Sequence, residues 1–253
     1  MNTNHQIRRA RLRKTVNSHH ENNNKAGARL SDVILGGQDG LVNTLGVILG
    51  LAAASSDFRI IVAGGLAGAI AEAVSMGAVG YTSKVAERDF YISELNREKN
   101  EIENMPREEE QEIRDIYEKK GFQGQLLEDV VQVITSNEKV WLETMMQEEL
   151  NLTPMDAKRP FKSALLIGAT SFLGAIIPLV PFALFYFLAI RFAGDVNVAV
   201  FWALGVSALT LFAAGAVKSR LTVGRWYRSG LQMLVIGILS ALSGYVIGML
   251  FTI

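Results

Sequence analysis

Five long stretches of the chain are dominated by apolar residues. They cover residues 31–54, 60–81, 163–190, 196–217 and 230–253. A helix needs about 20 such residues to cross the hydrocarbon core of a bilayer, because each residue adds roughly 1.5 Å to its length. A large soluble helical core is the alternative, but such a core rarely contains five nearly uncharged runs of this length. The pattern therefore predicts an all-α membrane protein with five transmembrane helices.

The first two stretches also contain glycines spaced four residues apart. Small residues at this spacing let helix backbones approach closely in a membrane, where burial of apolar surface gives no drive for association. We therefore expect both helices to pack tightly against their neighbours. The glycine pairs are Gly36/Gly40, Gly46/Gly50 and Gly64/Gly68.

Residues 84–160, between the second and third stretches, combine many charges with a repeating apolar stripe. No Pro or Gly interrupts residues 84–104, so the second membrane helix is expected to continue through them. The segment is therefore expected to be a helical insert. Start and stop signals predict its other helices from Pro106 to residues 119–121, over residues 125–135, and from an Asn137 cap to Leu150.

The net charge of zero is the sum of two opposite parts. Residues 85–157 contain 19 acidic and 8 basic side chains and carry −11, whereas the remaining 180 residues carry +11. Residues 1–30 hold much of the positive charge, and we expect them to form a basic, disordered arm. The predicted domains are this arm, two membrane helices within 31–83, the insert at 84–160, and three membrane helices within 161–253.

Lys and Arg near the membrane stretches predict the orientation of the chain. They gather in residues 1–30, in residues 218–228 and at both ends of the insert, whereas the opposite side has only Arg59 and Arg191. Basic residues resist translocation, so the N-terminus and the insert are expected in the cytosol. No cleavable signal peptide is expected, because residues 1–30 contain no short apolar core. The expected location is a cell membrane or a vacuole-type membrane.

The composition excludes several classes of chemistry. The chain has no cysteine, which rules out disulfides, Cys zinc sites, thiolate nucleophiles and iron–sulfur centres. It has no phosphate-binding loop, no nucleophile elbow and no Glu-x-x-His pair of the kind that ferroxidases use. The basic arm lacks interleaved aromatic residues, so we expect no nucleic-acid partner. We therefore expect neither an enzyme nor a prosthetic group.

Three residues within the first two stretches could hold a metal ion in the membrane. Glu72 and Met76 are four residues apart and share a helix face, and Asp39 lies in the first helix. An Asp at the centre of a bilayer costs at least about 2.5–3.5 kcal/mol, so such residues mark transport pathways. The alternative is that both carboxylates lie near helix ends and reach water. Two carboxylates and a thioether suit ferrous iron or manganese, and carboxylates also exchange protons.

The insert repeats this chemistry at higher density. Its candidate ligands stand at helical spacing, as the pairs Glu98/Glu101 and Glu109/Glu112 and the group Met145, Met146 and Glu149. The alternatives are a solvated charged face and methionines that fill the core. His19, His20 and Glu21 are a weaker candidate, because a flexible solvated arm explains them as well.

These motifs resemble the vacuolar iron transporter (VIT) family, whose members carry ferrous iron and manganese. The resemblance extends over nearly the whole chain from about Arg29. It rests on the sequence GQDGLV from Gly37 with Leu45-Gly46, on AEAVSMG from Ala71, on EEQEIRDIYEKK from Glu109, and on WLETMMQEEL from Trp141.

The resemblance implies a homodimer whose first helices line a shared pathway. It implies Asp39, Glu72 and Met76 as membrane ligands, and the seven insert residues named above as metal collectors. This chain departs from the family at Gly80, where many members have a carboxylate. Glu72, one turn above Met76, is the candidate to replace it.

We therefore expect a secondary carrier in the lipid bilayer that exports ferrous iron from the cytosol in exchange for protons. Manganese, zinc and cobalt are other candidate cargoes. The alternative is a membrane-anchored metal sensor or storage accessory that does not transport. Carboxylates within the membrane favour the carrier, because a sensor needs only the insert.

Overall fold

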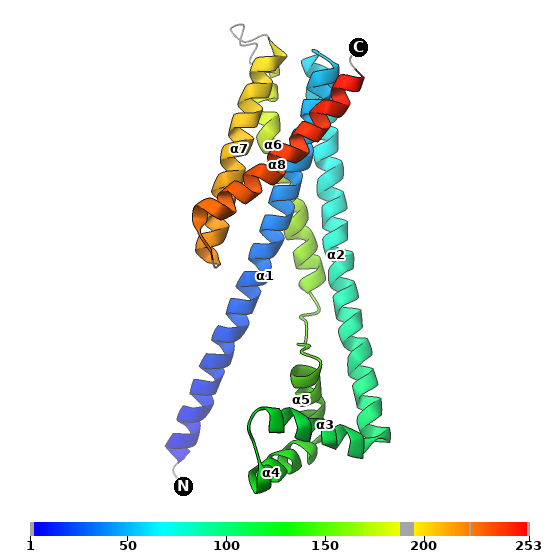
Figure 1. The fold of residues 1–253 in the computed structure, drawn as a ribbon, viewed down its shortest axis with the longest axis vertical. Coiled ribbons are helices and arrows are strands. Elements are labelled where there is room, and N and C mark those ends of the chain that lie inside the picture. The colour runs from blue at the N-terminus through cyan, green and yellow to red at the C-terminus, as the bar shows by residue number, and fades with distance from the viewer. Residues whose placement is uncertain (1–2, 188–194, 223, 252–253) are drawn as a thin grey trace. The chain divides into compact units, whose positions relative to one another are not determined.

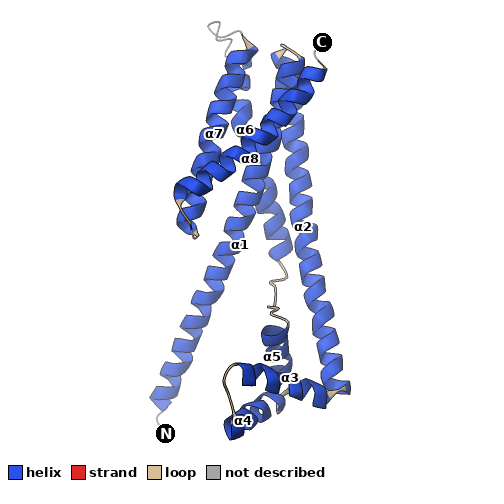
Figure 2. Cartoon of the chain, in the orientation of Figure 1, coloured by secondary structure: helices blue, strands red, loops and turns tan. Residues whose placement is uncertain are grey.

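The computed structural model describes the backbone of residues 3–187, 195–222 and 224–251, and their side chains from Ala26 onward. These residues form helices joined by short loops, with no strand among them (Figures 1 and 2). The helices in order are α1 (Thr3–Ala54), α2 (Phe58–Asn104), α3 (Pro106–Lys119), α4 (Gly124–Thr135), α5 (Glu138–Thr144), the π-helical turn η1 (Met145–Glu149), α6 (Arg159–Phe187), α7 (Val196–Leu221) and α8 (Trp226–Leu250).

Among the described residues, five helices are long and apolar enough to cross a membrane, in agreement with the five predicted stretches. They are α1 from Ala26, α2, α6, α7 and α8. The last residues of the third and fifth predicted stretches, through Ile190 and Ile253, lie outside the described residues, as does Arg191.

The chain divides into two compact units. The membrane unit comprises Met1–Tyr81 and Phe161–Ile253, and the insert unit comprises Thr82–Pro160. Helix α2 contributes its apolar first part to the membrane unit and its charged second part to the insert unit.

Glycines bring α1 into close contact with two other helices of the membrane unit. A Cβ atom on Gly40 would overlap the carbonyl oxygen of Ser171 in α6. One on Gly50 would lie 2.9 Å from the carbonyl oxygen of Gly244 in α8, the helix that crosses α1 in Figure 1. These contacts confirm that the glycine spacing in α1 serves helix packing.

The first part of α1 differs from the sequence prediction. The charges of residues 1–30 predict a disordered arm, but the helix begins at Thr3. No Pro occurs in residues 3–54. Because the apolar part of α1 already supplies a helical nucleus, each further residue adds a hydrogen bond without the cost of nucleation. Composition alone does not register this advantage. Only the backbone is described where His19, His20 and Glu21 lie.

The insert helices begin and end close to the predicted residues. Pro106 opens α3, and the Asn137 side chain accepts a hydrogen bond of 3.2 Å from the Val140 backbone N–H at the start of α5. The π-helical turn η1 is a feature that the sequence pattern does not predict. The apolar core of the unit consists of Ile102, Ile113, Leu127, Val131, Ile134, Trp141 and Met145.

Candidate metal sites

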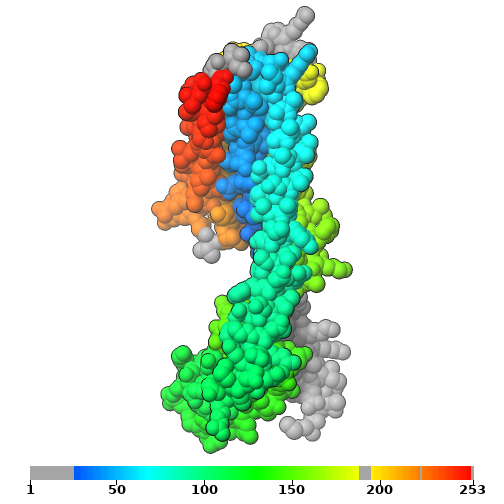
Figure 3. Space-filling model, turned by 90° about the vertical axis from the view of Figure 1, so that its right-hand side faces the viewer, coloured from blue at the N-terminus to red at the C-terminus, as the bar shows by residue number. Residues whose placement is uncertain are grey.

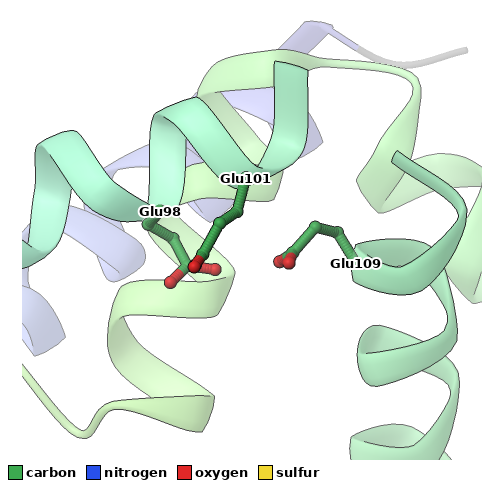
Figure 4. Close-up of side chains that lie close together, drawn as sticks. All are labelled: Glu98, Glu101 and Glu109. Carbon is green, nitrogen blue, oxygen red and sulfur yellow. The ribbon is translucent and has the colours of Figure 1, made fainter. Parts of the chain in front are cut away.

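Three glutamates of the insert unit meet in a small group that we call the glutamate cluster: Glu98, Glu101 and Glu109. One carboxylate oxygen from each lies within 4.8 Å of those of the other two. Glu98 and Glu101 stand on the last turns of α2, and Glu109 stands on the first turn of α3 (Figure 4). The break in the helix at Met105 turns the chain so that the two helices direct these side chains toward each other.

Two of these carboxylates are buried without full hydrogen bonding. The side chains of Glu98 and Glu109 are only 1% and 4% exposed. Glu98 Oε1 and Glu109 Oε2 have no hydrogen-bond partner. Buried polar atoms are almost always paired, because an unpaired one loses its hydration without compensation. These two buried oxygens would therefore gain partners only from a bound cation or from protons.

The pKa values of the cluster are shifted in the direction that such crowding requires. Burial, aided by the negative charges of Glu149 and Glu109, raises the pKa of Glu98 to about 8. Burial also raises the pKa of Glu149 to about 7, with contributions from Glu112 and Glu109. These interactions connect Glu112 and Glu149 electrostatically with the glutamate cluster. Of the five glutamates that the sequence singled out in the insert, three form the close group, and the charges of Glu112 and Glu149 act on it.

The two methionines are both buried in the insert unit. Met145 belongs to the apolar core with Ile113 and Trp141, which agrees with the alternative that it fills space. Met146 is also buried, and it shares the η1 turn with Glu149. Several carboxylates alone suit hard divalent ions such as manganese, and a nearby thioether favours softer transition metals such as ferrous iron.

A second polar group lies in the membrane unit, where α1 and α2 are neighbours. Asn43 Nδ2 donates a hydrogen bond of 3.1 Å to Glu72 Oε1. Asp39, one turn before Asn43, interacts with both of these side chains. Met76 follows Glu72 by one turn and is half-buried. The structure therefore places Asp39 and Glu72 beside each other.

Asn43 and Arg97 belong to these two sites although the sequence pattern did not indicate them. Asn43 is a polar residue inside an apolar stretch, four residues after Asp39, and this spacing could have revealed it. Arg97 forms ion pairs with members of the glutamate cluster but stands in a segment rich in charges of both signs. Nothing in that local pattern distinguishes it from a surface arginine.

Gly80, where many members of the resembled family have a carboxylate, is buried against α6. A Cβ atom there would lie 2.7 Å from Ile167 Cδ1 and 3.5 Å from Ala164 Cα. In this chain, Gly80 therefore packs against α6 and supplies no side-chain oxygen as a ligand.

The surface beside the membrane polar group is apolar and uncovered. On α1, Leu35 and Val47 flank Asp39 and Asn43 at four-residue intervals, and both are exposed. On α2, Ile70 and Val74 are also exposed, Val74 at 69%. Figure 3 shows part of α1 at the surface between α8 and α2.

Comparison with known proteins gives consistent matches along most of the chain. Residues 30–249 match the family model described as VIT family. Vacuolar iron transporter 1 of Oryza sativa subsp. japonica is 33% identical over 231 residues, which are 90% of this chain and 88% of that protein. Vacuolar iron transporter 1 of Arabidopsis thaliana is 32% identical over 234 residues, covering 92% and 90%. The vacuolar iron transporter of Plasmodium falciparum (isolate 3D7) is 30% identical over 236 residues, covering 92% and 86%.

Proposed function

This chain belongs to the vacuolar iron transporter family, and from that premise we propose that it is a secondary carrier that moves ferrous iron out of the cytosol in exchange for protons. Manganese is the second candidate cargo, because both ions accept the same mixture of oxygen and thioether ligands. Zinc and cobalt follow as weaker candidates.

The observation that carries this proposal is the polar group of Asp39, Asn43 and Glu72 on two membrane helices. Placing a carboxylate within a membrane costs free energy, so carboxylates found there usually belong to an ion pathway. The hydrogen bond between Asn43 and Glu72 holds one carboxylate beside the other. In the proposed cycle, Asp39, Glu72 and Met76 hold the metal during transfer and accept protons when it leaves.

The glutamate cluster has the role of a collector in this proposal. Its unpaired buried oxygens support a cation-binding function, and the net charge of −11 over residues 85–157 attracts divalent ions. Glu112, Glu149, Met145 and Met146 complete the proposed ligand set. The basic flanks of the membrane helices support a cytosolic position for the insert and the N-terminus.

We further propose that two copies of the chain form the pathway together. In a single copy, the polar group of Asp39, Asn43 and Glu72 adjoins the exposed side chains Leu35, Val47, Ile70 and Val74. Ionisable residues within a membrane almost always face protein or a water-filled cavity. A symmetric second copy would cover this surface and place both polar groups along a shared path.

Transport by the purified full chain in proteoliposomes tests the proposal. We expect ferrous iron uptake driven by a proton gradient, abolished in Asp39→Ala and in Glu72→Ala, and only slowed in Glu109→Ala. Glu103→Gln is the matched control, because Glu103 is exposed on α2 and paired with Lys99 outside the cluster. If iron still binds but no variant or condition yields flux, the chain is instead a membrane-anchored sensor or storage accessory.

A further inference from the structure

Arg97 places a permanent positive charge at the edge of the glutamate cluster. Its Nη1 lies 2.9 Å from Glu101 Oε2 and 3.2 Å from Glu101 Oε1. Its Nη2 lies 3.8 Å from Glu98 Oε2. One guanidinium thus engages both oxygens of one cluster member and approaches a second. Because arginine stays charged at every physiological pH, the positive charge at this edge is permanent.

The other edge of the same guanidinium is held by a carboxylate outside the cluster. Nε and Nη2 of Arg97 donate to Glu94 Oε2 at 3.1 and 2.9 Å. The Arg97 side chain is 46% exposed, whereas that of Glu98 is 1% exposed. Arg97 can therefore turn away from Glu101 toward water while it keeps its bond to Glu94. The buried glutamates have no such freedom.

A divalent ion bound to Glu101 would share the two carboxylate oxygens that accept hydrogen bonds from Arg97. Carboxylate ligands bind a metal through the same lone pairs that accept hydrogen bonds. The guanidinium would also repel the ion, since both are positive and lie close together. The contact of Arg97 with Glu101 therefore opposes metal binding at this carboxylate.

We propose that Arg97 is a built-in counter-cation of the glutamate cluster, which competes with divalent metal for Glu101 and so weakens metal binding and speeds metal release. This inference rests on the proposed collector function of the cluster. A collector must pass its metal on, and a tethered competitor that refills the site keeps the binding reversible. Glu94 acts as the resting partner that keeps its hydrogen bonds to the guanidinium when metal is bound.

Binding of Mn²⁺ alone to the full chain in detergent tests this role, with free Mn²⁺ followed by electron paramagnetic resonance. All variants carry Asp39→Ala and Glu72→Ala, so that the membrane site does not contribute. We expect Arg97→Gln to bind Mn²⁺ roughly tenfold more tightly, the factor that corresponds to one pKa unit of charge interaction, and to release it more slowly. Arg97→Lys keeps the charge but cannot contact Glu94 and Glu101 in the same way. Its affinity for Mn²⁺ should lie between that of the variant with Arg97 and that of Arg97→Gln.

A second variant separates competition from a merely structural role. Glu94→Gln removes the resting partner, so the guanidinium is left to the cluster and Mn²⁺ binding should weaken. A structural role would shift both variants in the same direction. Arg114→Gln is the matched control, because Arg114 pairs with Glu110 and Glu128 at 3.1 and 2.9 Å and has no ion pair with the cluster. Its affinity for Mn²⁺ should not change.

Glu98→Gln distinguishes failure of this inference from failure of the proposed function. If Glu98→Gln abolishes Mn²⁺ binding but Arg97→Gln binds with equal or lower affinity, the counter-cation role is overturned. If Glu98→Gln leaves binding unchanged, the cluster is not a metal site and the collector function itself fails. Thermal unfolding without metal establishes that each variant is folded before its affinity is compared.

Discussion

Asn43 of α1 donates a hydrogen bond of 3.1 Å to the carboxylate of Glu72 in α2. The contact joins the first two membrane helices through an amide and an acid, beside the carboxylate of Asp39. An amide both donates and accepts, so Asn43 can restrain one acid without adding charge. The pair thereby fixes where Glu72 stands relative to Asp39.

Replacing Asn43 by Ala should slow ferrous iron transport by on the order of tenfold, because an acid that loses its partner costs about 1–3 kcal/mol. Initial uptake rates in proteoliposomes measure the effect. Leu209→Ala, at an exposed position on α7, is the control and should transport normally. Equal rates for the two variants would show that Asn43 does not position Glu72.

Disulfide cross-linking should detect the proposed dimer. The natural chain has no cysteine, so an introduced cysteine is the only thiol that can react. Val47→Cys places a single thiol next to the polar group, on a side chain that is 44% exposed. Oxidation in native membranes should join two copies of this variant. Leu209→Cys on α7 is also exposed and should remain monomeric. Equal yields from both positions would indicate random collision rather than the proposed interface.

Metal-free protein should lose stability as the pH rises. The folded-state pKa of Glu98 is about 8 and that of Glu149 about 7, both above the ordinary value of 4.5. Between the ordinary pKa of 4.5 and these raised values, the folded chain binds more protons than the unfolded chain. Raising the pH through this range therefore favours unfolding. Thermal unfolding with a chelator should therefore occur at lower temperature at pH 8 than at about pH 5.

Added Mn²⁺ should reverse this trend, because metal binding replaces protons on the cluster and strengthens as they leave. Its stabilising effect should be larger at the higher pH. Glu98→Gln, which cannot ionise at this position, should reduce both the pH dependence and the response to Mn²⁺. An unfolding temperature independent of pH in the natural chain would contradict the raised pKa values.

Substitution of Gly40 by Ala should destabilise the membrane unit. The added methyl group would overlap the Ser171 carbonyl, and overpacking of this kind costs about 1–3 kcal/mol. Gly205→Ala in α7 is the matched control, because nothing lies within 4 Å of the position of its Cβ atom. There the better helix propensity of Ala should slightly raise the unfolding temperature. Thermal unfolding in detergent compares the two variants.

Hydropathy and local start signals predicted most of the helical elements. Five apolar stretches became five helices long enough to span a membrane, and Pro106 and Asn137 mark the starts of α3 and α5. These signals are local, since a helix depends on neighbours within about four residues. The helical start of α1 was missed for a related reason. The composition of residues 1–30 reflects only their own tendency to be ordered. It does not include the lower cost of extending a helix that has already formed in the adjoining residues.

The sequence by itself determined which residues could bind metal, because carboxylate and thioether chemistry is fixed by residue type and their spacing by the helix. The tertiary structure decided which of them meet. Arg97 and Glu98 are adjacent in the sequence, yet the Arg97 side chain is about half exposed and that of Glu98 is buried. The contacts of Glu98 with Glu109, and of Asn43 with Glu72, depend on how separate helices pack. Burial and charge interaction arise only from that packing, so the unpaired oxygens and raised pKa values of the cluster are properties of the folded chain.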